Sequence, residues 1–514
     1  MCRVTDLLRP TDRLVRVLLV PSLVFIATSV DRNYQTDLWH HLARGRVLVE
    51  EGTLLNSDRF TFTVNGQPLR DVNWAWQAAF YWLYRVGGLP LVQTANSAIL
   101  AVAFTLLFML TSWRCASRAV ACGVCVVAFL GLWPLMIIRP QSLSLLLFVV
   151  LMIAMDRANK DRRWLLLPPV VMTIWVNVHG GFPIGVFLVG VCTAARCVAM
   201  LVPRRPASGA LVEACGPWLL SIIGCLVATL ANPYGWHVYE YVALTSGRAS
   251  SRHIDEWLPP GLDSLTGKAF AVSVVATVVL GALPRRRLAL RDALVLGCFL
   301  MPALASVRMV AWWLLLWTPV TAAGLAAAWP RLRLLDADDT RVSRSAGAVA
   351  VGLLAVAVLS TPWFERINPV FRLPGRGHRT EEDLQATADF LAEQGARRIF
   401  TRFAWGEYLG WALSPQTTVF MDGRIEIFPD EVWQQYAAVT RGRSDWEDIL
   451  AGYDVDCLVL DASGYDGQLL AFVEQSSRWR EAARKGNAVV FLRESGGKTS
   501  SSQARRGIAS GPAN

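Results

Sequence analysis

Charged side chains are scarce in this sequence. Lys, Arg, Asp and Glu make up 18% of its 514 residues, while hydrophobic residues make up 54%. A soluble domain ordinarily carries about 25% charged and roughly 45–50% apolar residues. The apolar residues also gather in long blocks, which come near the length of helix that crosses about 30 Å of hydrocarbon. The shortage of charge therefore argues against a soluble protein, and we predict a polytopic α-helical membrane protein.

Cysteines outside the apolar blocks are also scarce. Cys2 and Cys457 stand apart, while the other eight of the ten lie in or beside apolar segments: Cys115, Cys122, Cys125, Cys192, Cys197, Cys215, Cys225 and Cys298. A buried free cysteine behaves as a small hydrophobic residue. This distribution excludes a disulfide framework and a zinc site of the cysteine type.

Nucleotide-binding signatures are absent. The sequence has no P-loop and no Rossmann fingerprint. Its net charge of +10 would suit nucleic acid, but the arginines stand in short loops between apolar blocks. The preference of Lys and Arg for cytoplasmic loops accounts for them. We expect no nucleic-acid partner.

The apolar blocks predict about eleven transmembrane helices. They are Leu14–Val30, Leu91–Thr111, Ala119–Ile138, Pro140–Met155, Trp164–Val178, Phe182–Val202, Ala210–Ala231, Lys268–Leu283, Asp292–Ala305, Met309–Trp329 and Ala346–Pro362. Asp31-Arg32-Asn33-Tyr34 follows the first block where a signal peptide would have small residues. We therefore expect that block to be retained as the first span.

The loops between these spans alternate in character. Short basic loops fall on one side, with Arg3, Arg9, Arg13, Arg16, Arg114, Arg118, Arg157, Lys160, Arg162, Arg163, Arg204, Arg205, Arg285, Arg286, Arg287, Arg331, Arg333, Arg341 and Arg344. The positive-inside rule makes this side and the N-terminus cytoplasmic. The other loops, rich in Trp, His, Asn, Asp and Gly, then face outward, as does everything after Trp363.

The outer loop 31–73 contains a predicted helix that runs to Glu51 and ends at Gly52, with Thr36 or Asp37 as its N-cap. Two interpretations stay open. Leu38, Trp39, Leu42, Val47 and Val49 fit an amphipathic helix in the membrane interface.

The second interpretation is functional, because Asp37, His40 and His41 lie within one turn of this helix. A carboxylate there suits a general base or a ligand of Mg²⁺ or Mn²⁺, and an imidazole suits proton transfer or contact with a phosphate.

Further polar residues stand at the outer ends of the spans. Asp71 closes the first outer loop, Asn177 and His179 precede a glycine turn, and Glu256 follows His253 in a later loop. For Asn177 and His179, an interhelical hydrogen bond is as good an explanation as a functional site.

Arg139 and Arg308 are single cations at outer ends, against the charge bias. A guanidinium group binds phosphate oxygens in pairs, so both arginines are candidates for a phosphate or pyrophosphate site.

Residues 363–495 have the texture of a small soluble α/β domain. We predict a helix from Thr380 to Gly395, another near 404–409, and strands at 398–402, 418–421, 457–461 and 488–493. Asp422 and Arg424 follow a strand, where either a binding loop or a structural turn is expected. The Ser- and Gly-rich tail 496–514 is expected to be disordered.

The stretch Gln35–Gly45 resembles a "D-x-D-L-W-W-H-L-x-x-G" segment found in a group of large bacterial membrane proteins. That group looks like the C-type glycosyltransferase (GT-C) superfamily. Further matches follow in order along the chain: Asp58–Thr63, Arg139–Gln141, Asn177–Phe182, Asn232–Trp236, Glu256–Pro259, Trp405–Leu409 and Phe420–Arg424. The resemblance implies a GT-C-like fold for 1–362 in a bacterial cytoplasmic membrane.

The resemblance also implies a chemistry. The donor would be a polyprenyl-phosphate sugar, and the acceptor a cell-envelope lipid, glycan or protein outside the cytoplasm. Asp37 would be the base or metal ligand, and Arg139 or Arg308 would hold the leaving lipid phosphate. This chain departs from the pattern at Gln35, where the family has an acid.

The related segment near Asp71 often carries glutamates where this chain has Asn73 and Gln77. These departures leave a metal-independent transfer or a loss of catalysis as the alternatives. Two other functions stay open: a transporter of lipid-linked saccharide, and a non-catalytic membrane scaffold. A transporter should have charges at mid-membrane depth and internal repeats, and the sequence has few of the former and no evident repeat.

Overall fold

The computed structural model describes residues 11–31, 37–201, 208–251, 255–283, 288–336, 342–369, 378–424 and 426–494. The tail 496–514, which was expected to be disordered, lies outside these ranges. Gln35, Thr36 and His253 also lie outside them. The chain forms two compact units. The first, called here the membrane unit, is 1–58, 67–378 and 424–427; the second, the C-terminal unit, is 59–66, 379–423 and 428–514.

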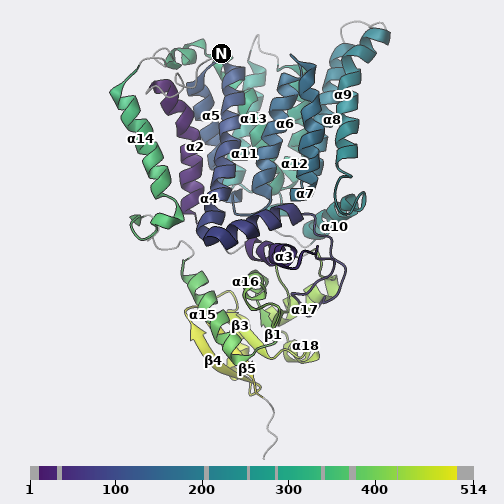
Figure 1. Cartoon of the computed structure of the whole chain (residues 1–514), viewed down its shortest axis with the longest axis vertical. Coiled ribbons are helices and arrows are strands. Elements are labelled where there is room, and N and C mark those ends of the chain that lie inside the picture. The colour runs from purple at the N-terminus through teal and green to yellow at the C-terminus, as the bar shows by residue number, and fades with distance from the viewer. Residues whose placement is uncertain are drawn as a thin grey trace, which may run out of the picture. The chain divides into compact units, whose positions relative to one another are not determined.

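The membrane unit is a bundle of helices (Figure 1). They are α2 (Asp12–Val30), α3 (Leu38–Glu51), α4 (Trp74–Cys115), α5 (Arg118–Leu132), α6 (Gln141–Arg157), α7 (Leu167–Val178), α8 (Phe182–Leu201), α9 (Ser208–Ala228), α10 (His237–Ser251), α11 (Leu265–Ala282), α12 (Leu290–Ala305), α13 (Val307–Ala328) and α14 (Arg344–Leu359), with short 3₁₀ turns such as η3 (Asp255–Trp257).

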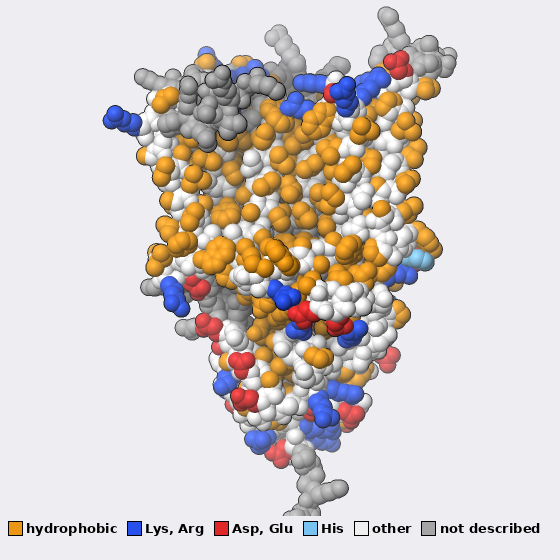
Figure 2. Space-filling view, viewed as in Figure 1, with side chains coloured by type: hydrophobic (Ala, Val, Ile, Leu, Met, Phe, Trp, Pro, Cys, Tyr) orange, Lys and Arg blue, Asp and Glu red, His pale blue; other side chains and the backbone are white. Residues whose placement is uncertain are grey.

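Every predicted span falls on one of these helices. Seven described helices are long and apolar enough to cross a membrane, namely α2, α4, α5 with its 3₁₀ extension, α8, α9, α11 and α13. The other four, α6, α7, α12 and α14, are apolar but have only 12 to 17 residues. The chain is therefore a multi-pass membrane protein, and the number eleven stays a prediction. Figure 2 shows a broad apolar surface over these helices, with Lys and Arg side chains gathered at its upper rim.

Helix α4 is broken near its first third. Gly87 and Gly88 have non-helical backbone angles, and Pro90 follows within the next turn. Proline lacks an N–H group and clashes with the preceding turn, so a helix bends there. As a result the first part of α4 lies across the bundle in Figure 1, at the end where α3 and α10 also lie. We call this end the α3 end.

Helix α3 has the predicted bounds, and Gly52 ends it in the left-handed conformation with a φ of 70°. The residues from Leu38 to Gly45 are all buried. Both interpretations of this stretch, the amphipathic helix in the membrane interface and the functional site, stay predictions. Gly45 makes this packing possible: a Cβ atom there would lie 2.3 Å from the carbonyl oxygen of Gln77 on α4.

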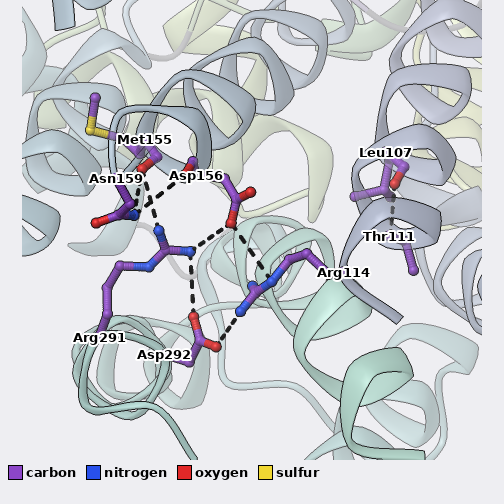
Figure 3. A network of polar contacts seen from close by, with 8 residues as sticks. All are labelled: Leu107, Thr111, Arg114, Met155, Asp156, Asn159, Arg291 and Asp292. Atoms are coloured by element: carbon purple, nitrogen blue, oxygen red, sulfur yellow. Dashed lines mark hydrogen bonds and ion pairs between the residues drawn. The ribbon is translucent and has the colours of Figure 1, made fainter. Parts of the chain in front are cut away.

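At the other end of the bundle, four charged side chains join α4, α6 and α12 (Figure 3). Arg291 Nη2 lies 3.1 Å from Asp156 Oδ1 and 3.5 Å from Asp292 Oδ1. Arg114 pairs with Asp292 and lies 3.7 Å from Asp156. The four groups carry no net charge, so each is compensated where water is scarce.

Replacing Asp292 with Asn should lower stability, because it leaves Arg114 and Arg291 with one carboxylate between them. We expect a loss of about 3–5 kcal/mol in unfolding free energy, as for other broken buried ion pairs. Thermal unfolding in detergent would measure it. Exchanging the exposed Glu213, which lies 4.0 Å from Arg162, for Gln is the control and should change little. Equal melting temperatures for the two variants would contradict a stabilising role of the four charged side chains.

The C-terminal unit has a five-stranded mixed sheet in the order β2-β1-β3-β5-β4. The strands are β1 (Arg398–Thr401), β2 (Thr418–Val419), β3 (Cys457–Asp461), β4 (Trp479–Lys485) and β5 (Ala488–Arg493). Strand β1 is parallel to β2 and β3, with Ile399 opposite Val419 and Cys457. Strand β5 runs antiparallel to β3 and β4. The segment Arg59–Gly66 pairs through Thr61 with Val419.

The helices of this unit are α15 (His378–Gln394), α16 (Phe403–Leu413), α17 (Asp430–Thr440), α18 (Trp446–Gly452) and α19 (Gly467–Gln475). Leu384, Ala388 and Leu391 of α15 pack with Ile399, Leu409 and Val459 in one apolar core. The predicted helix up to Gly395, the helix after 403 and four strands are confirmed. Strand β4 and helices α17 to α19 were not predicted, because their apolar patterns are short.

Candidate functional site

Asp37 and Arg139 begin the candidate site at the α3 end. Asp37 precedes α3, but its side chain caps no backbone N–H group. It is 40% exposed and lies 3.9 Å from the guanidinium of Arg139. Arg139 stands just before α6 and is buried, because the chain turns there between two apolar segments. Asp37 is thus an accessible carboxylate beside a buried cation.

Glu256 and Arg308 complete this charged cluster. Glu256, in η3, accepts a hydrogen bond of 2.8 Å from Arg139. Burial alone would raise the pKa of Glu256, but the guanidinium groups of Arg139 and Arg308 outweigh it and lower that pKa below its usual value. Arg308 lies at the start of α13, with its guanidinium 5.4 Å from the ring centre of Trp257. In the described part of the chain, no ion pair is found for Arg308.

His179 follows α7 and is held in one orientation. Trp175 Nε1 donates to Ser144 Oγ over 2.7 Å, and Ser144 Oγ lies 2.8 Å from His179 Nδ1. The backbone N–H of Gly181 also donates to Nδ1. Burial, with Arg308 and Arg139 nearby, lowers the pKa of His179 well below its usual range. Because Nδ1 accepts from the backbone N–H of Gly181, the proton of the imidazole is assigned to Nε2.

His41 is part of a second, buried network on α3 and α4. Its Nδ1 lies 3.0 Å from Gln77 Nε2 and 3.2 Å from Arg44 Nη2. Gln77 also donates to Asp71 Oδ1 over 2.8 Å, and Arg44 lies 3.2 Å from the same oxygen. Burial, then the charge of Arg44, lowers the pKa of His41 well below its usual range. His179 and Arg139 also act electrostatically on His41, so the two networks are neighbours.

His40 and Arg424 extend the site further. Burial and neighbouring cationic and imidazole groups, among them Arg44 and Arg424, lower the pKa of His40 well below its usual range. Arg424 is buried and lies 2.5 Å from Asp58, which is also buried. Two residues on, Glu426 accepts a hydrogen bond of 3.0 Å from Tyr241 of α10. Burial raises the pKa of Glu426.

Two predicted residues stand apart from the charged cluster. The amide of Asn177 donates to the carbonyl oxygens of Thr173 and Ala231, and its Oδ1 accepts from Trp74. The bonds to Ala231 and Trp74 tie α7 to neighbouring segments. They agree with the explanation of Asn177 as a residue that hydrogen-bonds between helices. Asp422 belongs to the C-terminal unit, where it is buried.

Sequence reasoning missed several members of the site. Arg44, Asp58, Ser144, Tyr241 and Glu426 were not candidates. Arg44 carried a signal, since it is a cation in an outer loop and lies one helical turn after His41. Asp58 begins one of the segments that carry the family resemblance, but it was not itself a candidate. Ser144, Tyr241 and Glu426 carried no signal, because their partners are distant in sequence: Tyr241 and Glu426 are 185 positions apart.

The acids that the structure describes at this site face cations, which disfavours a divalent cation between them. Among the described residues, no group of three or more His, Cys, Asp or Glu side chains is arranged to hold a metal ion. The two accessible acids, Asp37 and Glu256, already face Arg139, and Arg308 acts on both. A dication placed between these acids would be repelled by two guanidinium groups.

Comparisons with known proteins give the fold class. No protein-family model and no curated protein sequence matches the chain. Among solved structures, the crystal structure of the Archaeoglobus fulgidus oligosaccharyltransferase tethered with an acceptor peptide is similar, with a TM-score of 0.57 and 10% identity, over 87% of this chain and 69% of that one. ArnT from Cupriavidus metallidurans bound to undecaprenyl phosphate is similar with a TM-score of 0.50 and 13% identity, over 93% of this chain and 97% of that one.

These likenesses define a class of fold. Over most of its length, the fold of the chain is similar to that of C-type membrane glycosyltransferases. At identities this low the resemblance concerns the fold alone, so the function has to be argued from the site.

Proposed function

We propose that this protein is a membrane glycosyltransferase that moves a sugar from a polyprenyl-phosphate donor to an acceptor hydroxyl outside the cytoplasm. One observation carries the proposal: Asp37 is the most exposed acid of the site and lies beside the buried Arg139. Its side chain is 40% exposed, compared with 31% for Glu256, 3% for Asp71 and 2% for Asp58. The structure of ArnT with undecaprenyl phosphate supports the choice of donor.

In the proposed reaction, Asp37 takes the proton of the acceptor hydroxyl. The freed oxygen bonds to the anomeric carbon as the bond from that carbon to the phosphate oxygen breaks, so the configuration inverts. The electron pair of the broken bond stays on the lipid phosphate. Arg308, with the neutral N–H groups of His179 and His41, stabilises the charge that develops there. Arg139 is held by Glu256 and lies beside Asp37, 3.9 Å from its carboxylate.

The remaining expectations belong to the same proposal. The protein would lie in the cytoplasmic membrane of a bacterium, with its N-terminus in the cytoplasm and residues 363–495 outside. The acceptor would be a lipid, glycan or protein of the cell envelope. His41 would be kept in place by Asp71, Arg44 and Gln77. Arg424 would keep Asp58 and His40 in place.

The test is sugar transfer by the purified protein in liposomes, with a small panel of radiolabelled polyprenyl-phosphate sugars and extracted envelope acceptors. We expect transfer from at least one donor, with at least about half the rate remaining in EDTA, because guanidinium groups occupy the place of a metal. Loss of transfer in EDTA, restored by Mg²⁺ or Mn²⁺, would contradict the metal-free site. Absence of transfer from every donor would contradict the enzyme and favour the transporter or the scaffold.

A further inference from the structure

The C-terminal unit has a second polar cluster, at the carboxyl ends of its parallel strands. The chain runs from β1 to β2 on one side and then crosses to β3 on the other, so its direction of winding reverses between β1 and β3. In open α/β sheets, ligands bind outside the carboxyl ends of strands at this kind of switch point. Arg402 directly follows β1, and Asp461 ends β3.

These two residues are joined across the switch point. Arg402 Nη1 donates to Asp461 Oδ2 over 2.6 Å. The guanidinium of Arg402 lies 4.0 Å from the ring centre of Tyr465 and 5.5 Å from that of Trp405. Asp461 also accepts from the backbone N–H of Ser463, which fixes the loop that carries Tyr465. A planar ion pair and two aromatic rings are therefore held together at the strand ends.

Tyr465 is unusually exposed for an aromatic side chain. It is 54% exposed, and among the described large hydrophobic side chains of this unit only Phe472, at 43%, is comparable. Arg402 covers part of its ring, and the remainder is open to solvent. An aromatic face bears partial negative charge and attracts the slightly positive C–H groups of a ring stacked on it.

Buried polar atoms at the same place have no partner within the described part of the chain. They are Thr401 Oγ1, Arg402 Nε and Trp405 Nε1. Thr401 is fully buried, and Trp405 is 2% exposed. Buried polar groups are ordinarily hydrogen-bonded, so three such groups beside one strand end suit bridging water.

The charges select the kind of ligand. Asp461 balances the charge of Arg402, and the buried Asp466 accepts from the backbone N–H of Asp461 nearby. An anionic ligand would therefore find no uncompensated cation here. A neutral ligand with hydroxyl groups and an apolar ring face fits the open face of Tyr465 and the charge-balanced Arg402–Asp461 pair beside it.

We propose that the C-terminal unit has a binding site for a neutral saccharide, formed by Arg402, Trp405, Asp461 and Tyr465. The site does not depend on the proposed transfer reaction, because its residues belong to the C-terminal unit and take no part in the mechanism above. If transfer does occur, this site would hold the glycan part of the acceptor.

Saturation-transfer difference NMR on the full-length protein in nanodiscs would test it. The probes are three neutral oligosaccharides (a β-1,4-linked glucose tetramer, an α-1,4-linked glucose tetramer and an α-1,6-linked mannose trimer) and one acidic trimer of galacturonic acid. We expect at least one neutral probe to bind. Tyr465→Ala should weaken it about tenfold, Tyr465→Phe should retain it, and Phe472→Ala should match the wild type.

Either of two results would overturn the site: no neutral probe binding to the wild-type protein, or equal binding by wild type and Tyr465→Ala. Preference for the acidic trimer would overturn the ligand class. The measurement contains no donor lipid, so it gives the same answer whether or not the protein transfers sugar. The experiment can therefore contradict the saccharide site without contradicting the proposed glycosyltransferase activity, and the reverse also holds.

Discussion

Asp37→Asn is expected to reduce the rate of sugar transfer by about 10²–10⁴-fold, the usual contribution of a general base. The amide keeps the size and polarity of the side chain but cannot accept the proton of the acceptor hydroxyl. Asp37 is 40% exposed and caps no helix end, so the substitution should leave the fold intact. Binding of polyprenyl phosphate alone should stay within about twofold, because Arg308 and His179 are unchanged.

Single-turnover transfer in liposomes measures the first quantity, and equilibrium binding of a labelled polyprenyl phosphate measures the second. Asp263→Asn is the matched control. Asp263 is an exposed acid in the loop that follows Glu256, and its loss should leave the rate near that of the wild type. A rate for Asp37→Asn within a few fold of wild type would remove Asp37 as the base. Loss of lipid binding together with transfer would instead assign it to donor binding.

Arg44→Met should lower the free energy of unfolding by about 3–5 kcal/mol, the usual effect of breaking a buried ion pair. Arg44 and Asp71 are only 2% and 3% exposed, so the carboxylate would be left in a medium that solvates it poorly. Gln77 would still donate to Asp71, but it cannot supply the missing charge. Unfolding in mixed micelles, followed by circular dichroism, would measure the change.

Two comparisons make this result specific. The double variant Arg44→Met with Asp71→Leu removes both charges and should recover much of the lost stability, since an apolar pair often replaces a buried ion pair without cost. Arg70→Met is the control, because the Arg70–Glu240 pair is 40% and 43% exposed and should contribute at most about 1 kcal/mol. Equal effects of Arg44→Met and Arg70→Met would show that the buried pair does not stabilise the α3 end.

The elements that could be predicted share one property: their pattern lies within a single stretch of chain. The apolar blocks locate the membrane helices, since a helix must satisfy its own backbone groups in lipid. Gly52 and Gly395 end α3 and α15, because glycine accepts the left-handed conformation that ends a helix. Strand β4 was missed because its side chains are mostly exposed or half-buried, and such a strand lacks a clear apolar pattern.

In the candidate site, too, the sequence predicted single residues but not their partners. Asp37, His41, Arg139, His179, Glu256 and Arg308 were identified because acids, imidazoles and isolated arginines are unusual at the ends of apolar spans. Their pairing was not predictable, since Arg139 and Glu256 are 117 positions apart. Asn177 had the same kind of signal as His179, and only its hydrogen bonds to Ala231 and Trp74 show that it joins α7 to other segments.

The sequence by itself determined that this is a multi-pass helical membrane protein with an α/β unit near its C-terminus, because hydrophobic length and periodicity are properties of consecutive residues. The tertiary structure decided which polar residues are buried, which are paired and which remain accessible. It left Asp37 exposed beside Arg139 while Asp71 and Asp58 are each buried against an arginine. The reason is physical: a carboxylate's role depends on the charges and the water around it, and these are brought together only when distant segments pack.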